Sequence, residues 1–356
     1  MKTVIDREAK AARAVGLRYV SVDDPGIRRI KSGKAFKYVT PRNRTVKDAA
    51  ELKRIHALVL PPAWKDVWIC PLANGHIQAT GMDAKGRKQY RYHALWRATR
   101  DENKFNRMLS FGRTLPKIRR HVVKHILAPG LGREKILATI VRVMDLSAIR
   151  VGNEEYAQEN HHYGLTTLQH RHVQIHGSAI EFKFRGKSGQ FHDITIEDPR
   201  LSQIVKQCQH LPGQELFEWV DHNGETHSIT SSHVNDFLFE ITGEEFTSKD
   251  FRTWIGTSFA AHVLCHVGKK SMKSCINEAI KLVSEKLGNT PAVCKKSYVH
   301  PEIVECYRNG KLTRVFQEIQ RPIRGLHIEE TAVLTLLHEH HETIKGNKGG
   351  GKSARG

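Results

Sequence analysis

The spacing of apolar residues predicts strands in the first quarter of the chain. Residues 27–39 alternate between apolar and polar side chains around Ser32-Gly33, which is the pattern of a β-hairpin. A second hairpin is indicated where Asn74-Gly75 separates the apolar runs 67–70 and 76–80. Residues 88–93 alternate again and predict one more strand. Residues 1–95 should therefore form a small β-rich domain.

Two helices are expected to accompany these strands. Residues 3–15 have helical periodicity, and Gly16 follows them as a stop signal. Thr45 and Asp48 resemble a capping box and predict a helix that runs to about Leu58. Pro61-Pro62 ends that segment, because proline cannot continue the backbone hydrogen bonds of a helix.

Helical patterns dominate beyond residue 95. Residues 133–144 place Ile136, Ile140 and Met144 on one face. The stretch 172–196 interrupts the helices, because two alternating runs, 180–184 and 191–196, flank a Gly-rich turn with Lys187 at its tip. Further helices are predicted over 199–209, 231–241, 248–267, 271–287 and 329–344. Residues 345–356 are rich in Gly and Lys and should be a disordered basic tail.

The charge of the chain indicates a polyanionic partner. Its 57 Lys and Arg residues outnumber 37 Asp and Glu, which gives a formal net charge of +20. Such an excess favours nucleic acid, because each neutralised phosphate releases condensed counterions. No apolar run reaches the roughly 18 residues of a membrane-spanning helix. We therefore expect a cytoplasmic, nucleoid-associated protein without membrane contact.

Three features that suggest metal or nucleotide chemistry do not fit their motifs. The six cysteines are scattered without a C-x-x-C pair, which favours reduced thiols over disulfides or zinc. The segment His338–Glu342 misses H-E-x-x-H, because Glu342 stands where the second His should be, and it is expected to be a solvated helix face. Residues 346–353 fit the P-loop pattern, but no helix can follow to face a phosphate. No metal or cofactor is expected.

Four motifs occur in a fixed order and suggest a family. They are Ile149-Arg150-Val151-Gly152-Asn153, Phe184-Arg185-Gly186-Lys187-Ser188-Gly189, Lys249-Asp250-Phe251-Arg252-Thr253-Trp254 and Asn289 through Tyr298. With the N-terminal segment 81–92, this order resembles the compact poxvirus-like and bacterial branch of the type IB DNA topoisomerases, over roughly residues 25–310. The resemblance implies an α+β fold in which residues 1–95 bind DNA and residues 96–344 form a mostly helical catalytic domain with a β-hairpin insertion. The two domains would clamp duplex DNA, and the enzyme would act as a monomer.

The resemblance also implies the catalytic roles. Tyr298 is the expected nucleophile, which would hold a 3′-phosphate covalently while supercoils relax without ATP or metal. Arg150 and Arg252 would bind the phosphate oxygens, since guanidinium forks match them. Lys187 would protonate the leaving 5′-oxygen. Many members have His where this chain has Asn289, and an amide can donate a hydrogen bond but cannot carry a proton.

The remaining assignments have alternatives. Asn289 could serve only as a helix cap, and the two roles can coexist. Gln89 and Tyr90 match DNA-contacting positions but could lie on a water-facing strand, and Tyr156 could be a core residue. Lys249 is the fourth expected DNA contact. Tyrosine recombinases usually have His there, so Lys249 favours a topoisomerase over a recombinase. A DNA-compacting protein without catalysis is the other alternative.

Overall fold

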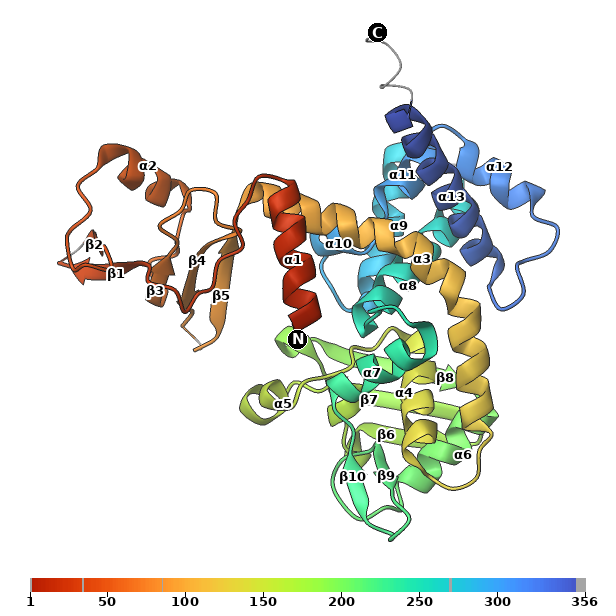
Figure 1. Ribbon diagram of the computed structural model, residues 1–356. Coiled ribbons are helices and arrows are strands. Elements are labelled where there is room, and N and C mark those ends of the chain that lie inside the picture. Colours follow the sequence, from red (N-terminus) through yellow and green to blue (C-terminus); the bar gives the residue numbers. More distant parts are fainter. Residues whose placement is uncertain (1, 34, 85, 269–270, 350–356) are drawn as a thin grey trace. The chain divides into compact units, whose positions relative to one another are not determined.

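The computed structural model describes residues 2–33, 35–84, 86–268 and 271–349, except for the side chains of residues 2–7, 100–104, 106, 155, 156 and 345–349. Its contacts divide the chain into two compact units, Met1–Phe105 and Asn106–Gly356. The boundary lies inside one long helix, α3 (Ala94–Ile126), about ten residues after the position that the hydrophobic pattern indicates. The fold is mixed, with a β-rich N-terminal unit and a larger, mainly helical one (Figure 1).

The N-terminal unit is built on one antiparallel sheet of five strands in the order β2-β1-β3-β4-β5. The strands are β1 (Ile27–Ser32), β2 (Ala35–Val39), β3 (Lys65–Ile69), β4 (Ile77–Met82) and β5 (Lys88–Tyr92). Helix α2 (Ala49–Ala57) lies between β2 and β3 in the chain and adds Ile55 to a core of Ile27, Val67, Ile69 and Ala79. Both expected hairpins are confirmed, since β1 pairs with β2 and β3 with β4.

Helix α1 (Lys2–Ala14) is held by a second, smaller core in the N-terminal unit. Ala12, Leu17 and Trp96 are buried together, and Tyr19 stacks on His76 with ring centroids 4.1 Å apart. Gly16 ends the helix with a φ of +75°, a backbone conformation that glycine adopts at little cost. The helix and its glycine stop are therefore as the sequence predicted.

The larger unit contains a small sheet beside a group of helices (Figure 1). The three-stranded antiparallel sheet consists of β6 (Val173–His176), β7 (Ala179–Arg185) and β8 (Phe191–Glu197). The short pair β9 (Glu218–Val220) and β10 (Thr226–Ser228) lies near it. The helices are α4 (Arg133–Ser147), α5 (Glu154–Asn160), α6 (Pro199–Cys208), α7 (Ser231–Thr242), α8 (Ser248–His266), α9 (Met272–Leu287), α10 (Pro291–Ser297), α11 (Pro301–Arg308), α12 (Lys311–Glu318) and α13 (Ile328–Gly349).

The core of this unit forms around α4 and α8. Helix α4 is buried on nearly every side, including Ile136, Ile140 and Met144 of its expected apolar face. Helix α8 is buried through Trp254, which is fully enclosed, and packs mainly against α9 and α13. None of the helices in the described part of the chain is long and apolar enough to cross a membrane.

Several elements differ from the sequence-based expectations. Thr45 does not cap α2; it forms an isolated bridge with Val39, while the side chain of Asp48 caps the helix by accepting from the Glu51 N–H. The 33-residue helix α3 was not predicted, because its sequence is polar and contains Pro116. Helix α13 continues to Gly349, so residues 345–349 are helical where a disordered tail was expected. Residues 350–356, which include the second half of the P-loop-like sequence 346–353, lie outside the described residues.

Candidate active site

Arg150 lies on a loop that is held by backbone hydrogen bonds to the segment Gly164–Thr167. The Leu165 N–H donates to the Arg150 carbonyl at 2.9 Å, and the Thr166 N–H donates to the Val151 carbonyl at 2.7 Å. Gly152 has a φ of +105° and lies against Gly164, where an added Cβ would come within 2.6 Å of the Gly152 backbone. The two backbones can come this close only because both residues are glycines. The position of Arg150 is therefore set by backbone contacts of the motif Arg150-Val151-Gly152.

Arg252 is a buried cation, with 3% of its surface exposed. Its guanidinium donates to the Ala148 carbonyl, and to the Leu287 carbonyl at 2.7 Å. These carbonyls stand at the C-terminal ends of α4 and α9, where helix dipoles favour positive charge. Burial, and then the charge of Arg150, lower the pKa of Arg252 to about 10. The guanidinium still keeps its proton at neutral pH, and two helix ends fix its orientation.

Tyr298 is the C-terminal cap of α10, and helix α8 holds its backbone. The Thr257 hydroxyl donates to the Tyr298 carbonyl at 3.0 Å and accepts from the His300 N–H at 3.1 Å. Gly256 leaves room for this contact, because a Cβ there would lie 2.8 Å from the Tyr298 carbonyl oxygen. Sequence reasoning missed both positioning residues, since a Gly-Thr pair inside a helix carries no signal of its own.

The phenol of Tyr298 lies in a positive environment. The Arg252 guanidinium carbon is 5.3 Å from the centre of the Tyr298 ring. Burial by itself raises the pKa of Tyr298, but the charges of Arg252 and Arg150, a hydrogen bond with Arg252 and the charge of Lys249 outweigh it and lower that pKa below its ordinary value. The surroundings therefore favour the phenolate, which is the nucleophilic form.

Asn289 joins the same site from the end of α9. Its Oδ1 accepts a hydrogen bond from Arg150 Nη2 at 2.9 Å. Its Nδ2 is buried and has no hydrogen-bond partner. A buried donor without a partner is costly, which makes a ligand oxygen a natural acceptor for it. The alternative that Asn289 is a helix cap is wrong, because Gly288 is the C-cap of α9 and Thr290 is the N-cap of α10.

Lys187 is exposed at the tip of the β7–β8 hairpin, as the sequence predicted. The turn is closed by the Gly186 N–H, which donates to the Gln190 carbonyl at 2.7 Å. The link between this turn and the rest of the site is His192, a residue that sequence reasoning missed. Its ring is close to both Gly186 and Gly288, and Gly288 directly precedes Asn289. The only sequence signal was a histidine on an otherwise ordinary alternating strand.

The four expected DNA-contacting residues are spread over both units. Tyr90 is exposed on the edge strand β5, and Gln89 beside it donates to Asp83 Oδ2 at 3.0 Å. Lys249 is exposed in the first turn of α8, three residues before Arg252. Tyr156 belongs to α5, but its side chain lies outside the described residues.

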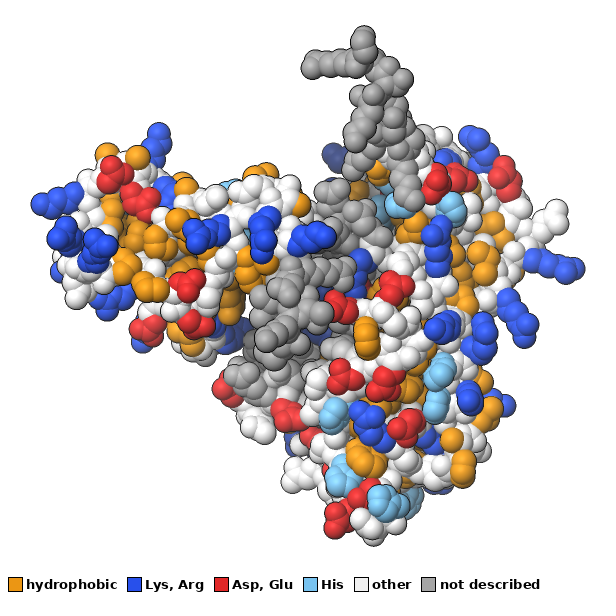
Figure 2. Space-filling view, viewed as in Figure 1, with side chains coloured by type: hydrophobic (Ala, Val, Ile, Leu, Met, Phe, Trp, Pro, Cys, Tyr) orange, Lys and Arg blue, Asp and Glu red, His pale blue; other side chains and the backbone are white. Residues whose placement is uncertain are grey.

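Exposed basic side chains gather at the β1–β2 end of the N-terminal unit (Figure 2). They come from the two strands and the loop that follows, and are Arg28, Lys31, Lys37, Arg42, Arg44 and Lys47. Such a surface suits a phosphate backbone.

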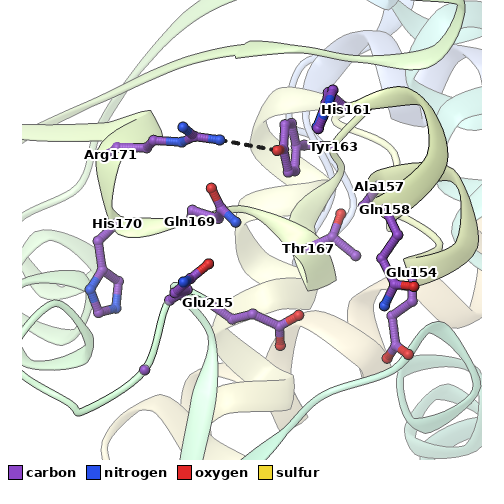
Figure 3. A pocket seen from close by; sticks show the side chains of 12 residues that line it. Glu154, Ala157, Gln158, His161, Tyr163, Thr167, Gln169, His170, Arg171 and Glu215 are labelled. Carbon is purple, nitrogen blue, oxygen red and sulfur yellow. Dashed lines mark hydrogen bonds between the residues drawn. The ribbon is translucent and has the colours of Figure 1, made fainter.

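The larger unit also contains a hollow of about 710 Å³ with a mostly polar lining (Figure 3). Glu154 of α5 and Glu215 line it, as do Arg171 and Tyr163, and the Arg171 guanidinium donates to the Tyr163 hydroxyl at 3.1 Å. None of Tyr298, Arg150, Lys187, Arg252 and Asn289 lines this hollow. It is therefore separate from the cluster around the tyrosine.

Within the described residues, Asp221, Glu225 and His227 form a group that could hold a metal ion. Asp221 is already engaged there: it accepts from His227 Nε2 at 3.0 Å and from two backbone N–H groups of its own turn. In the segment 338–342, His340 is not simply solvated, because it pairs with Glu302 of α11 at 2.9 Å.

Comparison with known proteins identifies the family. The family model of the eukaryotic DNA topoisomerase I catalytic core matches residues 93–323, and the model of the bacterial DNA topoisomerase IB N-terminal domain matches residues 35–83. The DNA topoisomerase 1B of Acanthamoeba polyphaga mimivirus is 33% identical over 296 residues, which cover 80% of this chain and 88% of the relative. The DNA topoisomerase I of Monkeypox virus is 24% identical over 234 residues, covering 64% and 72%. The chain therefore belongs to the type IB DNA topoisomerases, the isomerases that change the topology of DNA.

Proposed function

We propose that this enzyme relaxes positive and negative supercoils by cutting one strand of duplex DNA through Tyr298 and resealing it, without ATP or metal. One observation carries the proposal. Tyr298 is held against the buried cation Arg252, within the field of Arg150, and Arg150 is hydrogen-bonded to Asn289, whose buried Nδ2 has no partner. A nucleophile, two cations and a spare donor suit a phosphodiester.

In the cleavage step the Tyr298 oxygen, having lost its proton to solvent, forms a bond to phosphorus. The bond from phosphorus to the 5′-oxygen breaks, and Lys187 gives its ammonium proton to that oxygen. The DNA 3′ end is then a phosphotyrosine, and the free 5′-hydroxyl end can rotate. Ligation reverses each step, and Lys187 takes back the proton. Because the phosphotyrosine keeps the energy of the broken bond, the cycle consumes no ATP.

Arg150, Arg252 and Asn289 stabilise the charge that develops on the non-bridging oxygens. Both arginines are held in place before DNA binds. Carbonyls at two helix ends accept hydrogen bonds from Arg252, and the loop that carries Arg150 is hydrogen-bonded to residues 165 and 166. Preorganised donors of this kind are each worth about 10²–10³ in rate. Asn289 acts here as a donor and not as a proton carrier.

DNA binding is assigned to both units, which would enclose the duplex as a monomer. The N-terminal unit supplies Gln89, Tyr90 and the basic β1–β2 end, and the larger unit supplies Lys249 and Tyr156. Arg150, Lys187, Arg252, Asn289 and Tyr298 all lie between residues 106 and 356, so the chemistry belongs to the larger unit.

Relaxation of supercoiled plasmid in the presence of EDTA and without ATP tests the overall activity. Covalent attachment is tested with wild type and Tyr298→Phe on the same duplex, stopped with denaturant, digested with nuclease and analysed by peptide mass. The wild type should carry a 3′-phosphate on Tyr298. The Phe variant should form no adduct but should bind DNA with the same steep salt dependence, because affinity comes mainly from phosphate neutralisation.

Other outcomes point to other proteins. An adduct on a different residue, or through a 5′-phosphate, would overturn the nucleophile assignment. Strict need for two DNA sites or for a second protomer would favour a site-specific recombinase. Binding without any adduct in the wild type would favour a DNA-compacting protein.

A further inference from the structure

The side chain of His192 fills the space between the Lys187 turn and the end of helix α9. A Cβ added to Gly186 would lie 2.7 Å from His192 Cδ2 and Nε2, and one added to Gly288 would lie 2.5 Å from Cε1. Both distances are shorter than real Cβ contacts, so the imidazole touches the backbone of both glycines. Gly186 directly precedes Lys187, and Gly288 directly precedes Asn289.

The ring is also fixed from within the hairpin. His192 of β8 stands opposite Phe184 of β7 in the antiparallel register. The two rings stack with centroids 4.9 Å apart and an interplanar angle of 19°. Phe184 is 3% exposed and His192 9% exposed. A planar ring held in this way has little freedom to move, so the distance between the two glycine backbones depends on the size of the ring between them.

The imidazole of His192 is uncharged at neutral pH, as a residue packed beside two arginines should be. Burial, and then the charges of Arg150 and Arg252, lower the pKa of His192 to about 4. At neutral pH the imidazole is therefore neutral, and it adds no further positive charge next to the two arginines. A Lys or Arg at this position would bring a buried cation that the site could not solvate.

We infer that His192 is a positioning residue, the spacer that sets the distance of the Lys187 turn from Asn289 and the phosphate-binding arginines. This inference rests on the proposed role of Lys187 as the acid that protonates the 5′-oxygen. The lysine is exposed on a turn with two left-handed residues, Ser188 and Gly189, so the turn alone does not determine where its ammonium group lies. The contact of the His192 ring with Gly186 and Gly288 fixes the position of the turn relative to Asn289.

The test is single-turnover cleavage of two duplexes that differ at one atom, oxygen or sulfur at the 5′-bridging position. A thiolate leaves without a proton, so the sulfur duplex does not need the acid. His192→Ala should cleave the oxygen duplex about 10- to 100-fold more slowly, as expected for a catalytic group displaced by about 1 Å. It should cleave the sulfur duplex at close to the wild-type rate, and this also shows that the variant is folded.

Two further variants complete the design. In a Lys187→Ala background, His192→Ala should cause no additional loss on the oxygen duplex, because its effect passes through the lysine. His176→Ala, which removes an exposed histidine from strand β6 at the other edge of the same sheet, is the matched control and should behave as wild type on both duplexes.

The outcomes separate the inference from the proposed function. An equal loss on both duplexes for His192→Ala, or losses that add to those of Lys187→Ala, would overturn the spacer role and leave the enzyme's chemistry as proposed. If sulfur fails to rescue Lys187→Ala itself, the assignment of the acid is wrong, and the role of His192 toward that acid fails with it.

Discussion

At the scale of single residues, Asn289 shows how a site can be incomplete until its substrate arrives. Its carbonyl oxygen is used by Arg150, while its Nδ2 is buried without a partner. Asn289→Ala should slow single-turnover cleavage by about 10²–10³, the usual loss for one donor to a developing oxyanion. Asn289→His should keep much of the rate, since imidazole can donate to the same oxygen. Wild-type cleavage by the Ala variant would mean that Asn289 has only a structural role.

A second residue-scale prediction concerns pH. Lys249 is exposed, and its charge is one of those that lower the pKa of Tyr298. Removing that charge in Lys249→Met should raise the pKa of the phenol, so that phenolate forms only at higher pH. The rising limb of cleavage rate against pH should therefore move to the alkaline side. Lys206→Met, an exposed lysine on α6, should leave the profile in place. An unmoved profile in Lys249→Met would show that this limb does not report Tyr298.

At the scale of elements, helix α8 organises the site. Arg252 and Gly256 are four residues apart, so they lie on the same face of the helix. That face holds the buried guanidinium and the Tyr298 backbone together. In the capping box at its start the Thr247 N–H donates to Asp250 at 2.8 Å, and the helix begins at Ser248, four residues before this arginine. One rigid element thus sets the relative position of cation and nucleophile.

The contact between helix α8 and the backbone of Tyr298 is tested by Gly256→Ala. Alanine favours a helix by up to about 1 kcal/mol over glycine. Here, however, its Cβ would meet the Tyr298 carbonyl oxygen at 2.8 Å and Leu287 Cδ1 at 3.1 Å. Cleavage should fall by about 10- to 100-fold through displacement of the tyrosine, while circular dichroism stays unchanged. The control is Gly132→Ala before α4, where an added Cβ meets nothing within 4 Å. Equal activity of the two variants would contradict the positioning role of Gly256.

At the scale of the whole molecule, a buried ion-pair network joins four helices of the larger unit. Arg119 of α3 donates to Asp145 of α4 at 2.9 Å and to Glu330 of α13 at 2.7 Å. The Trp254 indole of α8 donates to the same Glu330 at 3.0 Å. The network therefore includes α8, the helix that carries Arg252. It stabilises the packing of the helices around the site and takes no part in the reaction.

Arg119→Met should lower the free energy of unfolding by about 3–5 kcal/mol, because two buried carboxylates lose their partner. Urea denaturation measures this change. Arg308→Met removes a solvent-exposed ion pair with Glu305 and should cost at most about 1 kcal/mol. Similar losses for the two variants would show that the network is not a main support of the unit.

The same network gives stability a pH dependence. Burial raises the pKa of Glu330, but its hydrogen bonds and charge interaction with Arg119 outweigh this and lower the pKa below the ordinary 4.5. A carboxyl whose pKa is lower when folded stabilises the protein above its unfolded pKa. That contribution should be lost as the pH falls below about 4.5 and through the folded value. Glu330→Gln should remove this part of the acid sensitivity in urea denaturation at a series of pH values.

The sequence by itself determined most of the local structure and the family. Asn74-Gly75 and the alternating runs around Lys187 were sufficient for their hairpins, because turn type and side-chain alternation are local properties of the chain. Ordered motifs around Arg150, Lys187, Arg252 and Tyr298 were sufficient for the family resemblance. The polar helix α3 and the helical residues 345–349 were not predicted, since neither has the apolar periodicity on which a helix prediction depends.

Only the tertiary structure decided how these residues meet. The burial of Arg252 under two helix ends, the unpartnered Nδ2 of Asn289 and the support of Tyr298 by Gly256 depend on segments tens of residues apart in the chain. His192 is the clearest case, because its strand pattern is unremarkable and its importance comes from two glycines, Gly186 and Gly288, which are about a hundred positions apart. Contacts of this kind arise when separate elements pack together. The spacing of side chains along a single element therefore cannot predict them.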